Sequence, residues 1–171
     1  YEKGAELIRM LEMLVGPVNF MRGIKIYIET FDGQAATTED FFNSIIRGSN
    51  TEKVNSIFNI EKFKNWYYEA GTPQVYVNQS WDPITSTLTI SFEQKLNCDF
   101  SDNNIEMVIP ILYSCYSSEN NSKAIVEDKL FVLDKHKKKL TITGFDKQKK
   151  APILSIFRRF SAPVNWHSDL S

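Results

Sequence analysis

The first part of the chain places apolar residues at the spacing of an amphipathic helix. Within residues 2–16, four of them recur at intervals of three and four positions and so share one face: Leu7, Met10, Leu11 and Leu14. Charged residues lie off that stripe, and Gly16 followed by Pro17 provides a stop signal. This pattern predicts a helix that buries one face.

Three more helices are predicted ahead of residue 71, by the same period and by turn residues at their ends. They cover residues 18–31, 39–46 and 60–70. Thr37 and Asp40 match a capping box in front of the second of these helices. The first part of the chain is therefore expected to be a helical bundle.

Beyond Pro73 the apolar pattern changes to strict alternation. Leu88, Ile90 and Phe92 alternate with polar residues, which is typical of a half-buried strand over residues 86–94. Further strands are predicted at residues 74–78, 107–117, 128–134, 138–145 and 152–160. Pro110 lies inside one of them and indicates a sheet edge or a bulge.

The two patterns together predict the fold class. No helical crossover of adequate length separates the strands, so they favour an antiparallel β-sandwich over a parallel α/β sheet. We expect an α+β chain by segments, with a helical part at residues 1–72 and a β-sandwich at residues 73–171. The turn residues around Gly71 mark the division between them.

Composition narrows the range of partners. The chain has 20 basic and 21 acidic residues, which argues against binding nucleic acid or an anionic membrane through summed charge. It also contains no uninterrupted apolar run long enough for a membrane span. We therefore expect no nucleic-acid partner, no membrane partner and a cytoplasmic location.

The histidines and cysteines do not form a metal-binding motif. The two histidines, His136 and His167, match no H-E-x-x-H spacing, and His136 lies in a lysine-rich turn. The two cysteines, Cys98 and Cys115, match no C-x-x-C spacing. We expect no metal site and no nucleophile among these four residues.

Two lysine-rich segments, residues 134–139 and 146–150, flank one predicted strand. They could form a basic edge for RNA or for an acidic partner. We favour a different role, in which they keep the sheet soluble and block edge-to-edge pairing of strands. Aspartates beside both segments support that interpretation, because they offset the positive charge.

Trp66, Tyr67 and Tyr68 form an aromatic cluster that could stack on a ligand. Their helical spacing beside Phe63 favours a different role, as core residues where the helices meet the sheet. We therefore expect packing rather than a binding site.

Five features of the sequence, taken in order, resemble the aminopeptidase N family of zinc metallopeptidases in its bacterial form. They are YEKGAELIRMLEMLVG, then an F..G...Y spacing, then DGQAATTEDF, FKNWYYEAGTP and FRRFSAPV. The likeness runs through residues 1–73 and returns at 160–164. It is thin across the strands, and residues 49–63 are longer than the family's usual link into the last helix.

The resemblance implies that the chain, which begins with Tyr1 rather than methionine, is a fragment of a zinc-dependent aminopeptidase that removes N-terminal residues from peptides. Residues 1–72 would be the end of a thermolysin-like catalytic domain. Residues 73–171 would be the immunoglobulin-like β-sandwich that follows it. The expected partners are peptide substrates of the complete enzyme and the remaining domains of the same chain.

By the same resemblance, Tyr1 matches the family's catalytic tyrosine. A neutral phenol can donate a hydrogen bond to the oxygen that becomes negative when water attacks the scissile carbonyl. The family's zinc ligands and general-base glutamate precede this tyrosine, so zinc would be held by residues outside the fragment. The fragment alone is therefore expected to be inactive.

A rival interpretation makes the chain a non-enzymatic interaction module whose β-sandwich binds a protein through its lysine-bearing edge. In the peptidase interpretation, the sandwich is a structural support instead. That interpretation also predicts an exposed apolar patch in the isolated fragment, along Leu7, Leu11 and Leu14, which would favour self-association.

Overall fold

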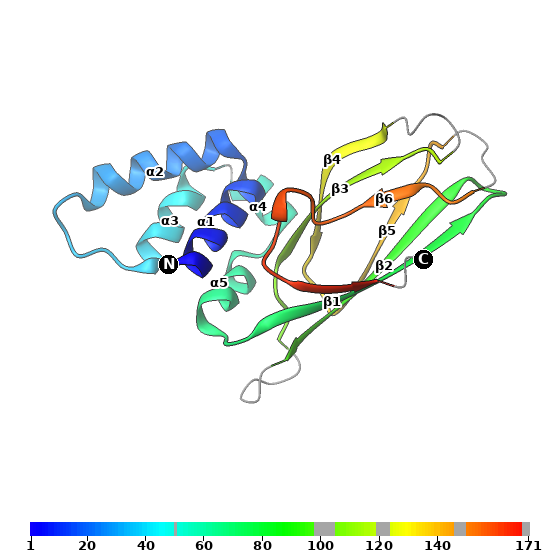
Figure 1. The fold of residues 1–171 in the computed structure, drawn as a ribbon. Coiled ribbons are helices and arrows are strands. Elements are labelled where there is room, and N and C mark those ends of the chain that lie inside the picture. Colours follow the sequence, from blue (N-terminus) through cyan, green and yellow to red (C-terminus); the bar gives the residue numbers. More distant parts are fainter. Residues whose placement is uncertain (50, 98–104, 119–123, 146–149, 169–171) are drawn as a thin grey trace. The chain divides into compact units, whose positions relative to one another are not determined.

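The computed structural model describes residues 1–49, 51–97, 105–118, 124–145 and 150–168. The chain divides into two compact units, a helical unit at residues 1–60 and a sheet unit at residues 61–171 (Figure 1). None of the described helices combines the length and the apolar character needed to cross a membrane.

The helical unit contains four helices: α1 (Glu2–Val15), α2 (Pro17–Phe31), α3 (Thr38–Arg47) and α4 (Thr51–Ile57). The first three confirm the helices expected from the apolar period. Gly16 separates α1 from α2 with a φ of 85°, a conformation that glycine adopts without steric cost. Helix α4 is not among the helices expected from the sequence, because its seven residues are too few to show a clear apolar period.

The expected apolar patch on α1 is wrong for this structure. Leu7, Leu11 and Leu14 are 2 %, 1 % and 2 % exposed, and α1 packs against α2 and α4. Apolar exposure lies on α2 instead, where three side chains keep more than half of their surface: Val18, Met21 and Ile28. The stripe predicted to lack a partner is therefore covered.

Helices α2 and α3 pack closely through two glycines. A Cβ atom built on Gly48 would lie 2.2 Å from the backbone nitrogen of Gly23, which is closer than real contacts allow. Neither residue has a positive φ. These glycines are therefore required by the close approach of the two helices rather than by the backbone conformation.

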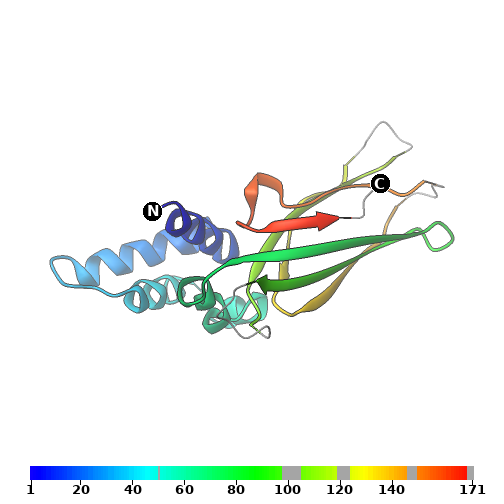
Figure 2. The same cartoon turned by 60° about the horizontal axis from the view of Figure 1, so that its bottom comes forward.

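The sheet unit begins with α5 (Ile60–Tyr68) and continues with seven strands: β1 (Thr72–Asp82), β2 (Thr87–Asn97), β3 (Ile109–Tyr116), β4 (Ala124–Leu133), β5 (Lys137–Ile142), β6 (Ile153–Ser155) and β7 (Asn165–Ser168). They form a four-stranded sheet in the order β5-β2-β1-β7 and a three-stranded sheet in the order β4-β3-β6 (Figure 2). Phe92 of the first sheet stacks on Phe131 of the second, with ring centroids 5.1 Å apart. The β-sandwich is thus confirmed.

One strand pair departs from the antiparallel expectation. Strand β7 was not predicted from the sequence, and it pairs with β1 in parallel, with Gln74 opposite Asn165. Its four residues include no apolar alternation that would mark a strand, and all but one are exposed. Long-range pairing with β1, rather than local propensity, accounts for this strand.

The strand predicted over residues 152–160 is mostly wrong. Only β6 is extended, and a short 3-10 helix, η1 (Arg158–Phe160), follows it. Phe157, Arg159 and Phe160 all have a φ close to +50°, which a strand cannot accommodate. Arg158 and Arg159 both bind the carboxylate of Asp128, at 2.6 and 2.5 Å, and these contacts hold the turn.

Pro110 lies on the central strand of its sheet, but in a stretch that resembles an edge. It pairs with Val132 of β4, whereas β6 pairs only with Ser114, Cys115 and Tyr116 of β3. The missing N–H of proline therefore costs no hydrogen bond to β6, because β6 does not reach Pro110. The irregularities in the β3–β4 register occur later, between Tyr113 and Tyr116.

Helix α5 is fastened to the start of β3. The Trp66 indole nitrogen donates to the backbone oxygen of Val108 at 2.8 Å, and Asn65 donates to the oxygen of Glu106 at 3.1 Å. Trp66 and Phe63 are buried, as the core interpretation predicts. Tyr67 and Tyr68 are 36 % and 67 % exposed, so that interpretation is wrong for them.

Candidate functional site

Tyr1 is the candidate catalytic residue, and it lies at the N-cap of α1. Its backbone oxygen accepts a hydrogen bond from the nitrogen of Ala5 at 3.0 Å, while its side chain makes no capping hydrogen bond. The side chain is fully exposed. The helix thus fixes the backbone of Tyr1 and leaves its phenol available to donate.

His136 lies in the turn between β4 and β5, as its lysine-rich surroundings predict. Its backbone nitrogen donates to Glu106 at 3.1 Å, and its backbone oxygen accepts from Gln94 at 2.8 Å. The Gln94 side chain is buried and joins the same turn to the backbone of Met107. His136 therefore takes part in a structural network.

His167 lies on β7, on the sheet that also carries Tyr76. Its ring stacks on the Tyr76 ring with centroids 5.1 Å apart, and its Nε2 is 2.9 Å from the side-chain oxygen of Gln74. Within the described part of the chain, no group of three or more histidine, cysteine, aspartate or glutamate residues could hold a metal ion. The residues described do not fit a zinc site.

Cys115 is a buried core residue on β3. Burial raises its pKa to about 11, so the thiol stays protonated and is a poor nucleophile at neutral pH. Cys98 lies outside the described residues.

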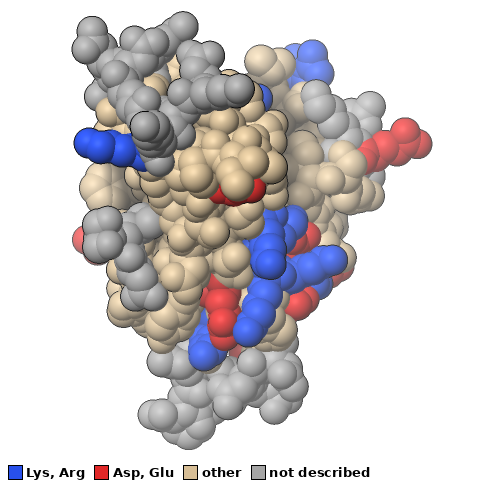
Figure 3. Space-filling view, turned by 90° about the vertical axis from the view of Figure 1, so that its right-hand side faces the viewer, with Lys and Arg blue, Asp and Glu red and all other residues tan. Residues whose placement is uncertain are grey.

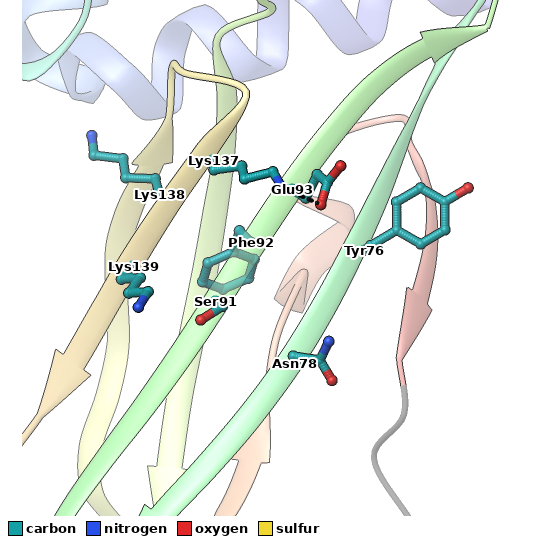
Figure 4. A pocket seen from close by; sticks show the side chains of 8 residues that line it. All are labelled: Tyr76, Asn78, Ser91, Phe92, Glu93, Lys137, Lys138 and Lys139. Atoms are coloured by element: carbon teal, nitrogen blue, oxygen red, sulfur yellow. Dashed lines mark ion pairs between the residues drawn. The ribbon is translucent and has the colours of Figure 1, made fainter.

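A hollow of the sheet unit lies on the four-stranded sheet, and we name it the sheet-face groove. Its volume is about 340 Å³. Its outward side chains come from three strands (Figure 4): Tyr76 and Asn78 from β1, Ser91 and Glu93 from β2, and Lys137 and Lys139 from β5. Lys138 points elsewhere and bonds to Asp134 at 2.7 Å.

Glu93 is the acidic residue among these side chains, and lysines compensate its charge. Lys137 lies 3.2 Å and Lys95 3.4 Å from its carboxylate. The hydrogen bond from Lys137, with a smaller contribution from Lys95, lowers the pKa of Glu93. Glu93 therefore remains ionised at neutral pH and is paired.

The lysines of residues 137–139 lie within β5, an edge strand, whereas the sequence analysis placed their segment beside a strand. Figure 3 shows lysine and arginine side chains gathered near the centre of the face drawn, with aspartate and glutamate side chains beside them. Most of the second lysine-rich segment, residues 146–149, lies outside the described residues. A purely basic surface for RNA is not seen on the face drawn.

The sequence did not predict the sheet-face groove. Its members are spread over residues 76–139, and only the register of β1, β2 and β5 makes them neighbours. The alternation over residues 86–94 did show that Ser91 and Glu93 would point away from the core. Pairing of the strands was the missing information.

Two family models match the chain. Residues 1–66 match the peptidase family M1 domain. Residues 71–169 match a domain of unknown function, DUF3458, described as having an Ig-like fold.

Individual relatives carry related names. Over 96 % of its length, the chain is 34 % identical to aminopeptidase N of Escherichia coli, and over 99 % it is 31 % identical to aminopeptidase N of Haemophilus influenzae. The crystal structure of Legionella pneumophila aminopeptidase A in complex with aspartic acid superposes on the whole chain with a TM-score of 0.81 and 29 % identity. The chain spans about a fifth of the length of these curated relatives.

Proposed function

Because this chain belongs to the M1 peptidase family, in its aminopeptidase N form, we propose that the complete protein removes N-terminal residues from peptides. The observation that carries the proposal is the match of both units, residues 1–66 and 71–169, in the order found in these peptidases. The non-enzymatic interpretation has no comparable observation in its favour.

The proposal assigns residues 1–72 to the end of the catalytic domain and residues 73–171 to the sandwich that supports it. Zinc would be the cofactor of the complete protein. Since the described residues do not fit a zinc site, the metal would be held by other parts of that protein, and this chain alone would not hydrolyse peptides. A cytoplasmic location and contact with the remaining domains complete the proposal.

Tyr1 is the residue of this chain that we assign to the reaction. Its phenol would donate a hydrogen bond to the substrate carbonyl oxygen, and this bond strengthens as that oxygen gains negative charge. A phenol donates while neutral, so it does not need to lose a proton in this role. The exposed side chain at the N-cap of α1 is compatible with such a contact.

The activity can be tested with two peptides that differ only at their amino end. The complete protein should release the first residue from a peptide with a free amine and should leave the N-acetylated copy intact. Release of internal fragments, or equal cleavage of both peptides, would contradict an aminopeptidase.

A further inference from the structure

The sheet-face groove contains polar groups that the fold itself does not use. Asn78, Ser91 and Lys139 have no side-chain hydrogen bond or ion pair with another described residue. They form one row across the sheet, because Asn78 pairs with Ser91 and Ser91 pairs with Lys139. Directly paired side chains lie roughly 5 Å apart at their Cβ atoms, so the row is continuous.

The composition of this row suits a carboxylate. Lys139 supplies an ammonium group on one side, Asn78 supplies an amide on the other, and the small Ser91 between them supplies a hydroxyl. All three groups can donate hydrogen bonds to an oxygen anion. The short serine side chain also leaves room for a ligand above it.

The neighbouring row does not repel an anion. It consists of Lys137, Glu93 and Tyr76 in register. Lys137 and Lys95 both pair with the carboxylate of Glu93. Together with Lys139 they carry three positive charges against the one negative charge of Glu93, so the surplus is two positive charges. Tyr76 is 41 % exposed, but His167 stacks on its ring with centroids 5.1 Å apart and the Lys95 ammonium lies 5.3 Å from the ring centroid. The remaining exposed part of the ring adds apolar surface beside the charged groups.

The spacing of the rows fits an extended chain. Residues two apart on a strand are separated by roughly 6.6–6.8 Å, which is also the distance between alternate side chains of an extended peptide. A ligand lying along the groove can therefore place one side chain on the row of Lys139 and another on the row of Tyr76. Glu93, on the row of Tyr76, would repel a ligand that is negatively charged along its whole length, so a continuous polyanion fits the groove less well.

We propose that the sheet-face groove binds an extended acidic peptide segment of a partner protein. A glutamate or aspartate of that segment binds Lys139, Ser91 and Asn78, and an alternate side chain packs against the part of the Tyr76 ring that His167 and Lys95 leave exposed. Charge complementarity supplies the attraction, and the strand-like spacing supplies the register. This binding is separate from peptide cleavage.

The test uses the complete protein and a fluorescent octapeptide in which pairs of glutamates alternate with pairs of tyrosines, N-acetylated and C-terminally blocked. In this peptide each glutamate has a tyrosine two positions away, on the same face of the extended chain. Acetylation removes the free amine, so the outcome does not depend on the proposed aminopeptidase activity. Fluorescence anisotropy should show saturable binding that weakens as salt rises. Lys139→Glu should weaken the affinity ~10-fold, as expected when a hydrogen bond to a charged group is lost.

Lys129→Glu is the matched control, because it makes the same charge change at an exposed lysine of β4 on the other sheet. It should alter the affinity less than about 2-fold. Asn78→Ala provides a second groove variant without a charge change and should also weaken binding. The melting temperature of each variant verifies that it is folded.

Four results would overturn the proposal. One is the absence of binding up to about 1 mM peptide, the weakest affinity that the site could usefully have. Another is an equal loss of affinity in Lys139→Glu and Lys129→Glu, which would indicate attraction to net charge alone. The third is equal binding of a peptide with lysines in place of glutamates. The fourth is tighter binding of single-stranded RNA.

Discussion

The helical unit and the sheet unit hold their polar side chains in different ways. In the helical unit the partners are sequence neighbours: Glu6 with Arg9, Lys25 with Glu29 and Thr37 with Asp40. In the sheet unit many partners are far apart in sequence: Lys62 with Glu106, Trp66 with Val108 and Asp128 with Arg158. Local pairs form with one helix, whereas distant pairs require the assembled sandwich.

The comparison predicts that the sheet unit is the more sensitive to loss of a single partner. Trp66→Ala should have the largest effect, a loss of ~3–5 kcal/mol in the free energy of unfolding, because it empties a core site. It also leaves the oxygen of Val108 without its donor. Urea unfolding followed by circular dichroism measures this loss.

Trp166→Ala is the control for that experiment, since Trp166 belongs to the same unit but is 45 % exposed. It should cost less than about 1 kcal/mol. If Trp66→Ala and Trp166→Ala lowered the free energy of unfolding by similar amounts, the burial of Trp66 and its hydrogen bond to Val108 would contribute little to stability.

Gly48→Ala tests the close approach of α2 and α3 inside the helical unit. The new methyl group would meet the backbone of Gly23, so the two helices must separate, at an expected cost of ~1–3 kcal/mol. Gly4→Ala is the matched control. Nothing lies within 4 Å of its added carbon, so it should stabilise α1 by ~0.5–1 kcal/mol. Opposite signs of the two thermal shifts are expected, and equal signs would contradict the close packing.

Thr37→Ala removes a local contact and should cost ~1 kcal/mol, the usual value of an N-cap. Thr37 accepts from the nitrogen of Asp40 at 3.2 Å, and Asp40 accepts from the nitrogen of Thr37 at 2.9 Å. Thr37→Ser should recover most of the loss because serine retains the hydroxyl. A loss as large as that of Trp66→Ala would refute the contrast between local and distant pairs.

Glu106 gives the smallest expected effect, which appears as a pH dependence. Its hydrogen bond from Lys62, with that from the His136 nitrogen, lowers the pKa of this carboxyl. Its stabilising contribution is therefore complete above the ordinary carboxyl pKa and is lost as pH falls through the lowered value. The pair should contribute less than about 1 kcal/mol because it is partly exposed. In Glu106→Gln, the melting temperature should fall less steeply between neutral and acidic pH, and an unchanged slope would contradict this role.

The same contrast explains what could be predicted from the sequence. The helices α1, α2 and α3 and the capping box of Thr37 depend on residues within one or two turns, so the local pattern was sufficient. Strand β7 and the turn at Arg158 depend on partners across the sandwich, and local propensity did not reveal them. Helix α4 escapes prediction for a different reason: its seven residues are too few to show a helical period.

The candidate sites follow the same rule. Tyr1 was found through likeness to a family, because nothing in its own surroundings distinguishes it from any helix-capping tyrosine. The sheet-face groove has no sequence motif, because Asn78, Ser91 and Lys139 come together only through the register of three strands. A site built from one strand's residues would have been visible, and a site built from three was not.

Replacing Tyr1 by phenylalanine in the complete protein tests the central claim most directly. Tyr1→Phe keeps the aromatic ring and removes only the hydroxyl that would bind the developing oxyanion. We predict that kcat on a free-amine peptide falls ~10²-fold or more, with the zinc content of the protein unchanged. Wild-type turnover in this variant would contradict the assignment of Tyr1 to the reaction.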